Sequence, residues 1–238
     1  MQTISILVPA AGCGSRAETS GNKILAPLCG EPLLWHTLRA LTNLPAFPAE
    51  TQPLELILAT RREEWELIQP ILSKLNIQNS TFKIQLVVGG TTRQDSVFAA
   101  AQAARGDFLL VHDAARPLVS PLLIKRVIKA ALQNGAALAA LPCPDTVKQA
   151  KDGFVELTLD RSVLWLAQTP QVFRRALLLD ALENAAHTGF EGTDCASLLE
   201  HLGHPVQLVP GEARNFKVTY PDDLERAETM LKAETLSD

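Results

Sequence analysis

Short apolar runs alternate with segments of helical periodicity along most of the chain. The runs, each short enough for one buried strand, cover residues 4–8, 54–59, 84–88, 108–111, 136–141 and 206–209. Apolar residues recur at helical spacing at 32–44, 63–75, 95–104, 120–134, 174–187, 195–202 and from 221. This alternation predicts an α/β protein with a Rossmann-like, mostly parallel sheet and helices on both faces.

The alternation breaks between residues 142 and 169. Residues 145–151 and 154–159 are more polar, alternating segments on either side of Asp152-Gly153, a pair typical of a hairpin turn. A two-stranded ribbon buries little by itself, so we expect it to lean on a second subunit. We therefore predict a single domain over residues 1–238, with a protruding β-hairpin arm at about 142–168 used in dimerisation.

Composition and charge exclude several classes of protein. The net charge of −4 gives no broad attraction to nucleic acid or an anionic membrane. No apolar run approaches the roughly 20 residues that span a bilayer, and the N-terminus lacks the pattern of a signal peptide. The four cysteines are scattered, which favours reduced thiols over a zinc site. We expect a cytoplasmic protein that binds neither nucleic acid nor membrane.

The loop that follows the first strand is rich in small residues. Small side chains allow a close backbone approach to a ligand, and the backbone N–H groups of such a loop can form an anion site. Arg16 and Lys23 add positive charge there. The loop lacks the Gly-Lys-Ser/Thr of a P-loop, and Ala17 stands where a dinucleotide-binding loop has its third glycine. A glycine-rich turn with two solvated cations stays open as the alternative interpretation.

Unusual residues collect after several of the predicted strands, where open α/β sheets bind their ligands. Small, cationic and hydroxyl-bearing residues follow the first, third, fourth and fifth strands and recur near the end: residues 9–23, then Gly89, Gly90, Arg93 and Ser96, then Asp113 and Arg116, then Thr146 and Lys148, and last Lys217 and Thr219. Independent surface charges would not gather in this way, so we predict one anion-binding site.

Each candidate also has a purely structural interpretation. Asp113 is either the cap of a turn or a group that holds Mg²⁺ or a ribose hydroxyl. Ser96 fits a helix-surface hydroxyl, Lys217 a solvated lysine and Arg161 a surface ion pair. His112 has no serine or cysteine placed to complete a catalytic triad, so a structural role is favoured for it.

Eight motifs occur together in one order along the chain. They are Pro-Ala-Ala-Gly-x-Gly-x-Arg at 9–16 with Lys23, Gly-Gly-x-x-Arg-x-Asp-Ser-Val at 89–97, Val-His-Asp-Ala-Ala-Arg-Pro at 111–117, Asp-Thr-Val-Lys at 145–148, Asp-Arg at 160–161, Gln-Thr-Pro-Gln-x-Phe at 168–173, Thr-Asp-x-Ala-Ser at 193–197 and Asn-x-Lys-Val-Thr at 215–219. In this combination the chain resembles the 2-C-methyl-D-erythritol 4-phosphate cytidylyltransferases and their relatives that use ribitol 5-phosphate.

The resemblance implies an activity, its residues and its partners. A polyol phosphate attacks the α-phosphorus of CTP, with Mg²⁺ held mainly by the triphosphate and, in a lesser role, by Asp113. The implied catalytic residues are Arg16, Lys23, Arg161 and Lys217, with Arg161 supplied by the partner subunit of a homodimer that shares its active sites. The implied nucleotide-binding residues are Pro9, Ala10, Ala11, Gly12, Gly14, Gly89, Gly90, Arg93, Ser96, Asp113 and Arg116. The implied substrate-binding residues are Thr146, Lys148, Thr169 and Thr219.

The chain departs from the family pattern at two places. The usual Pro-Lys-Gln is Asn22-Lys23-Ile24, and Cys195 replaces an acid after Thr193-Asp194. The first change lies next to the implied chemistry and motivates a rival, a non-catalytic CTP-binding module. Ribitol 5-phosphate remains open as the acceptor. A dehydrogenase is a weaker alternative, because Arg61 and Arg62 stand where a dinucleotide-binding fold has an acid.

Overall fold

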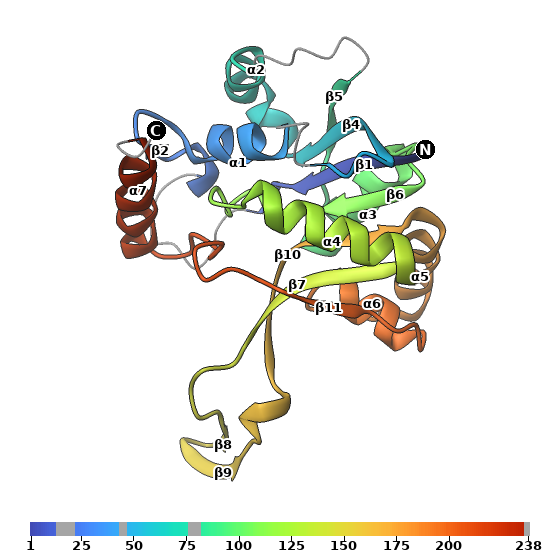
Figure 1. The fold of residues 1–238 in the computed structure, drawn as a ribbon, viewed down its shortest axis with the longest axis vertical. Coiled ribbons are helices and arrows are strands. Elements are labelled where there is room, and N and C mark those ends of the chain that lie inside the picture. Colours follow the sequence, from blue (N-terminus) through green and yellow to red (C-terminus); the bar gives the residue numbers. More distant parts are fainter. Residues whose placement is uncertain (13–21, 43–46, 76–81, 236–238) are drawn as a thin grey trace.

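A seven-stranded sheet forms the centre of the molecule (Figure 1). The computed structural model describes residues 1–12, 22–42, 47–75 and 82–235. The strand order is β11-β7-β10-β6-β1-β4-β5. The strands are β1 (Gln2–Pro9), β4 (Thr51–Thr60), β5 (Lys83–Val88), β6 (Phe108–Val111), β7 (Ala136–Pro142), β10 (Trp165–Arg174) and β11 (Gln207–Pro210). Each of the six predicted apolar runs forms one of these strands, and the α/β prediction is confirmed.

Strand β10 is the element that the sequence pattern missed. It lies between β6 and β7 and is antiparallel to both, whereas the other neighbouring strands of the sheet are parallel. Its middle carries Gln168, Thr169 and Gln171, which are all buried, so the segment has neither an apolar run nor an in–out alternation. The register against β7 also shifts between Ala167 and Gln171. Tertiary hydrogen bonds, and not local pattern, place this strand.

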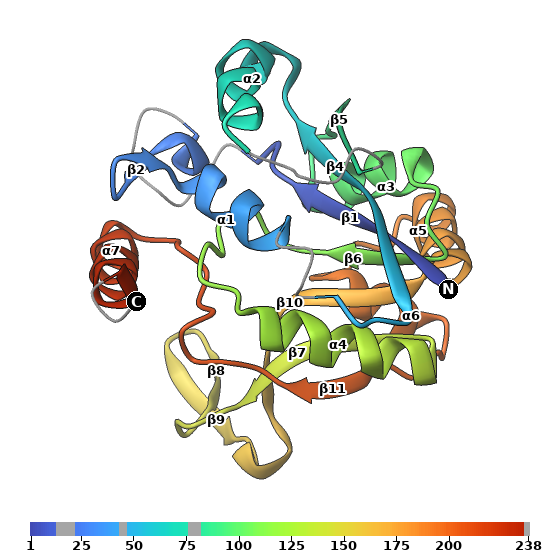
Figure 2. The ribbon, with the colours of Figure 1, turned by 45° about the horizontal axis from the view of Figure 1, so that its top comes forward.

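Helices cover both faces of the sheet, as predicted (Figure 2). Along β1, Ile4, Ile6 and Val8 point to one core cluster and Leu7 to the other, as the two-residue period of a strand requires. The first cluster includes residues of α1 (Leu33–Leu41), α2 (Trp65–Ser73) and α4 (Pro121–Asn134). The second includes residues of α3 (Arg93–Ala103), α5 (Arg175–Thr188) and α6 (Cys195–His201).

The last helix, α7 (Pro221–Thr235), packs apart from the two main layers. Ala227 shares a smaller core with Leu28 of the hairpin formed by β2 (Pro27–Leu28) and β3 (Glu31–Pro32). Val218 and Ala115 belong to the same cluster, so α7 holds the segment after β11 against the loop after β6. Within the described ranges, no helix combines the length and the apolar character needed to cross a bilayer.

Helix ends follow the capping signals of the sequence. The Ser120 hydroxyl accepts a hydrogen bond from the Leu123 N–H, and Pro121 takes the first position of α4. Gly135 ends that helix at φ 84°, a left-handed conformation that favours glycine. Pro70 lies inside α2 without ending it, since the helix continues to Ser73.

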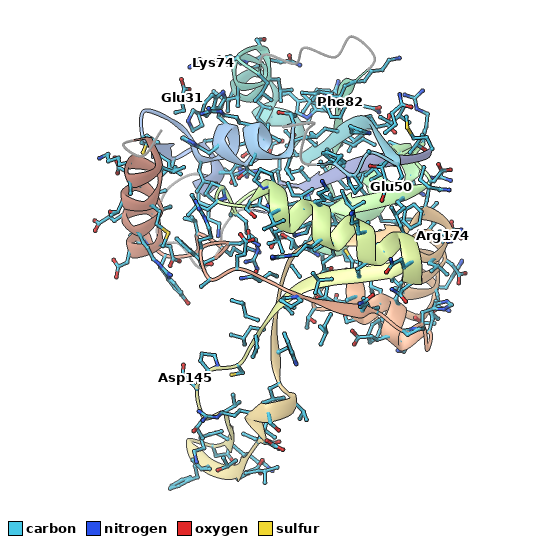
Figure 3. The ribbon with its side chains drawn as sticks, viewed as in Figure 1. Glu31, Glu50, Lys74, Phe82, Asp145 and Arg174 are labelled. Carbon is cyan, nitrogen blue, oxygen red and sulfur yellow. The ribbon has the colours of Figure 1, made fainter. Side chains whose placement is uncertain are left out.

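The arm is a two-stranded ribbon that projects from the body (Figure 1). It consists of β8 (Lys148–Lys151), β9 (Phe154–Thr158) and the short helix η4 (Arg161–Val163), with Asp152 and Gly153 both at positive φ in the turn. Asp145, labelled in Figure 3, lies where the chain leaves β7 for this ribbon. Because β7 and β10 pair as far as Pro142 and Trp165, the part of the predicted arm that lies beyond this pairing spans 143–164.

Candidate active site

Three cationic side chains surround the carboxylate of Asp113. Arg93 Nε lies 3.0 Å from Oδ1, while Lys217 Nζ and Arg116 Nε lie 3.1 and 3.6 Å from Oδ2. Arg93 begins α3 after β5, Asp113 and Arg116 follow β6, and Lys217 follows β11. The predicted meeting of residues from separate strand ends is therefore confirmed for these four, which we call the Asp113 cluster.

The Asp113 cluster carries an excess of positive charge. Three cations against one carboxylate leave a balance of two positive charges within the cluster. Burial alone would raise the pKa of Asp113, but the charges of Arg93, Lys217 and Arg116 outweigh it and hold that pKa far below its ordinary value. Asp113 is thus ionised at neutral pH, and the uncompensated charge suits a polyanionic ligand.

A buried histidine holds the Asp113 loop in place. His112 is fully buried, and burial lowers its pKa to about 4, so the ring is neutral at pH 7. Its Nε2 lies 3.1 Å from the Arg116 carbonyl oxygen, which can only accept, so the ring proton is on Nε2. Nδ1 then accepts from the Thr169 hydroxyl at 3.1 Å. The structural role favoured for His112 fits this geometry.

Thr169 takes part in two hydrogen bonds within the protein through its hydroxyl. Its hydroxyl oxygen also accepts a hydrogen bond from the Asp113 N–H at 3.0 Å, and the residue is 3% exposed. The hydroxyl therefore supports the loop after β6, and the substrate-binding role of Thr169 stays a prediction. Asn215 is buried just before Lys217. Its side-chain Nδ2 donates to the Thr169 carbonyl at 2.7 Å, and its backbone carbonyl accepts from Arg116 Nη1 at 2.7 Å.

Close packing joins the loops after β1 and β5. A Cβ atom at Gly89 would lie 2.5 Å from Ala11 Cβ and 3.0 Å from Ser96 Oγ, so no side chain fits there. These predicted nucleotide-binding residues are neighbours from two strand ends. Ser96 is buried and donates to the Thr92 carbonyl at 2.9 Å. The surface interpretation of Ser96 is therefore wrong.

A capping box fixes the start of α3. The Thr92 hydroxyl accepts from the Asp95 N–H, and the Asp95 carboxylate accepts from the Thr92 N–H, both at 3.0 Å. A Cβ at Gly90 would lie 2.1 Å from Asp95 Cβ. The motif at 89–97 is thus explained: its glycines permit close packing, and its acid holds the turn from which Arg93 reaches Asp113.

The first loop is described only at its two ends. Gly14 and Arg16 lie outside the described residues, as does Cys13. Pro9 ends β1, Ala10 and Ala11 are buried, and Gly12 is exposed. At the far end, Lys23 begins the short helix η1 (Lys23–Leu25), for which Asn22 is the cap.

The two departures from the family pattern have different surroundings. Ile24 is 4% exposed and packs in the main core, so its apolar side chain faces away from solvent. Cys195 is also buried, and its sulfur accepts from Arg93 Nη1 at 3.6 Å. Burial raises the pKa of this thiol, so it stays protonated. Arg93 therefore has Asp113 as its one carboxylate partner among the ion pairs found in the described residues.

Several predicted substrate residues lie on the arm and not in the Asp113 cluster. Thr146, Lys148 and Arg161 are exposed there. Lys148 Nζ donates to the Thr158 hydroxyl across the ribbon at 2.7 Å, and Arg161 Nη1 donates to the Pro144 carbonyl at 2.8 Å. Thr219 stands two residues beyond Lys217, where its N–H donates to Asp223 at the start of α7.

Several other residues of the site had no role predicted from the sequence, although Asn215, Asn22 and Asp194 stand in the motifs quoted above. Asn215, Asn22 and Glu64 are buried polar groups whose partners lie far away in the chain. Asp194 caps α6 and also accepts from Gln171 of β10 at 2.7 Å, which places Cys195 beside Arg93. A polar residue inside an apolar motif indicates a buried hydrogen bond. The sequence does not show which distant residue forms the other half of that bond.

The described residues do not fit a protein-held Mg²⁺. Both oxygens of Asp113 face cations, so a metal ion there would meet strong repulsion. Among the residues of the described ranges, no group of three His, Cys, Asp or Glu is arranged to hold a metal ion. Asp113 therefore organises the cations, and we withdraw its assignment as a metal ligand.

Comparisons with known proteins agree with this architecture. The family model of the 2-C-methyl-D-erythritol 4-phosphate cytidylyltransferases (IspD) matches residues 4–233. The enzyme of that name from Bacillus pumilus is 40% identical over 231 residues, covering 96% of this chain and 97% of the relative. The one from Syntrophotalea carbinolica is 42% identical over 240 residues, with 96% of each chain covered.

Solved structures give the same result. The 4-diphosphocytidyl-2C-methyl-D-erythritol synthase of Anaerococcus prevotii superimposes with a TM-score of 0.83 at 30% identity, covering 97% of this chain and 99% of that one. The 2-C-methyl-D-erythritol 4-phosphate cytidylyltransferase of Thermus thermophilus gives 0.76 at 35% identity, covering 98% and 100%. This chain therefore belongs to the 2-C-methyl-D-erythritol 4-phosphate cytidylyltransferase family.

Proposed function

We propose that this protein transfers the cytidylyl group of CTP to 2-C-methyl-D-erythritol 4-phosphate, yielding 4-diphosphocytidyl-2-C-methyl-D-erythritol and pyrophosphate in non-mevalonate isoprenoid biosynthesis. Family membership over residues 4–233 carries this proposal. The Asp113 cluster supports it, because three cations around one carboxylate suit the approach of a triphosphate and a phosphate monoester.

The chemistry needs little beyond positioning and charge. A phosphate monoester is largely dianionic at neutral pH, since its second pKa is about 6. One of its oxygens forms the new bond to the α-phosphorus of CTP, and the bond to the bridging oxygen breaks to release pyrophosphate. No proton must be removed, so a general base is unnecessary. The obstacle is the repulsion between two polyanions, which arginine and lysine side chains reduce.

The residues divide between the two ligands. We assign Arg16 and Lys23 to the triphosphate, where they oppose charge in the transition state, and Lys217 to the acceptor phosphate. The loops after β1 and β5 form the nucleotide side: Pro9, Ala10, Ala11, Gly12, Gly14, Gly89, Gly90 and Ser96. Arg93 and Arg116 contribute charge beside them. Mg²⁺ enters with CTP, as part of the substrate.

We assign the arm to a homodimer that shares its active sites. Apolar side chains on the arm are exposed, with 78% of Phe154, 62% of Val155 and 71% of Val163 accessible. A ribbon of this kind is stable when a partner covers it. Arg161, with Thr146 and Lys148, would then reach the Asp113 cluster of the partner. We place this enzyme in the cytoplasm, in keeping with the free thiols of its three described cysteines.

Mixing two inactive variants tests the shared site. Arg161→Ala damages the arm, and Lys23→Ala damages the body. Dimers formed by exchange contain one site with both defects and one site with neither, so we expect a statistical mixture to recover about a quarter of the wild-type pyrophosphate release. Each variant alone should release it on the order of 10²-fold more slowly. Failure to recover activity after exchange of differently tagged subunits has been verified would contradict the shared site.

A further inference from the structure

One asparagine side chain fastens both ends of the first loop. Asn22 Nδ2 donates to Glu64 Oε1 and Oε2 at 3.0 and 3.1 Å and approaches the Ala10 carbonyl at 3.3 Å. Asn22 Oδ1 accepts from the Ile24 N–H at 3.3 Å. Ala10 precedes the loop and Ile24 follows Lys23. We call these hydrogen bonds the Asn22 tether.

The tether ends on a buried carboxylate. Glu64 is 4% exposed and belongs to η3 (Arg62–Glu64), the turn after β4. It also forms an ion pair with Arg61. Hydrogen bonds to an ionised group are roughly twice as strong as those between neutral groups, so Glu64 holds Asn22 more firmly than a neutral acceptor would. The turn after β4 thereby holds the residue that precedes Lys23.

The backbone of Asn22 shows why this side chain is needed. Its φ of −76° and ψ of 112° are values that proline adopts. Proline is the residue of the family pattern at this place, and its ring restricts φ covalently. With asparagine here the backbone is freer, and the tether supplies the missing restriction through Glu64.

We propose that Glu64, acting through Asn22, is a positioning residue that holds Lys23 in its catalytic place. This proposal rests on the proposed function, which assigns Lys23 to the triphosphate. Small displacements of a positioned group can cost as much as about 10²-fold in rate. Loss of the tether should therefore reduce kcat and leave the binding of the acceptor almost unchanged.

The test is a mutant cycle with proline at position 22. We expect Glu64→Ala to lower kcat about 10-fold in the wild-type background, with KM for the acceptor changed less than twofold. In the Asn22→Pro background the same substitution should change kcat less than twofold relative to its parent, since the tether no longer exists. Equal losses in both backgrounds, or no loss in the wild type, would overturn the proposal.

Further variants separate positioning from stability. Glu64→Gln keeps an oxygen for Asn22, so it should retain kcat within about threefold. Asn22→Ala should match Glu64→Ala, and combining the two should give no further loss. If Glu64→Ala folds poorly, Asn22→Ala and Glu64→Gln carry the test: Asn22→Ala should lower kcat about 10-fold and Glu64→Gln should not. Glu55→Gln is the matched control, because Glu55 is 1% exposed and bonded to Ser5 and Arg105 near the opposite end of β6. Its kcat should equal that of the wild type.

Hydrogen exchange separates a failure of the Asn22 tether from a failure of the proposed function. The Ile24 amide is bonded to Asn22, so Glu64→Ala should speed its exchange about 10-fold whether or not the protein turns over CTP. An inactive wild type with this faster exchange would refute the proposed function and leave the tether. An active wild type whose Ile24 amide exchanges at the same rate in the variant would refute the tether.

Discussion

At the scale of the residue, Asp113 is the centre on which the site depends. Its ion pairs with Arg93, Arg116 and Lys217 form within the chain itself, before any ligand binds. Without its charge, three cations would repel one another at close range. The carboxylate therefore pre-organises the cations that a polyanion needs, and a bound triphosphate can supply the negative charge that the cluster lacks.

Asp113→Asn should reveal this role through its dependence on ligand. We expect the free energy of unfolding to fall by about 2 kcal/mol, less than for a fully buried pair because Lys217 and Arg93 are partly exposed. CTP should stabilise the variant more than it stabilises the wild type. Urea unfolding with and without CTP measures both effects. Equal stabilisation of the two proteins by CTP, or a loss no larger than that of the exposed Asp180→Asn, would contradict this role.

His112 should make stability depend on pH. Its pKa in the folded protein is about 4, below the ordinary 6.5, because burial and the nearby Arg116 and Arg93 outweigh Asp113 and the Arg116 carbonyl. A lowered histidine pKa gives stability that is present above 6.5 and lost as the pH falls toward 4. Between pH 7.5 and 5 this residue should cost about 2 kcal/mol.

His112→Gln removes the titration and keeps one donor and one acceptor. The difference in unfolding free energy between pH 7.5 and 5, measured by urea, should therefore be about 2 kcal/mol smaller in the variant. The same pH dependence in both proteins would show that His112 is not held neutral.

At the scale of the element, apolar periodicity determined which parts of the fold were predictable. Runs such as 108–111 are buried on both faces, so their unbroken apolar character predicts a strand. Strand β10 could not be predicted, because Gln168, Thr169 and Gln171 are satisfied by partners that only the folded chain provides. For the same reason the sequence indicated that residues after β5, β6 and β11 would meet, but it did not indicate that Glu64 would meet Asn22.

The start of α3 gives a prediction at this scale. An alanine at 90 would place its Cβ 2.1 Å from Asp95 Cβ, so Gly90→Ala must displace Asp95 and break the capping box. We expect a loss of about 1–3 kcal/mol, with a higher KM for CTP because Arg93 and Ser96 move with the helix. Thr92→Ala, which removes the cap without a clash, should cost about 1 kcal/mol. A Gly90→Ala protein as stable as the wild type would show that the turn is not constrained.

At the scale of the whole molecule, the sheet order turns scattered residues into one site. The strand order sets β1 beside β6, and the close approach of Gly89 to Ala11 brings the loop after β5 to the same place. Helix α7 holds the segment of Lys217 against the loop after β6. A chain with a net charge of −4 thereby carries an excess of two positive charges within the Asp113 cluster. The arm, with Arg161 at the start of η4, projects from the body, and our proposal of a shared site gives that residue to the partner subunit.

A comparison of acceptors tests the central claim most directly. Pyrophosphate release is followed with CTP, Mg²⁺ and either 2-C-methyl-D-erythritol 4-phosphate or ribitol 5-phosphate at equal concentrations. We predict rapid release with methylerythritol phosphate, at least about 100-fold faster than with ribitol phosphate, and a loss of on the order of 10²-fold in Lys217→Ala. Release with ribitol phosphate alone, or binding of CTP without release under either acceptor, would contradict the account.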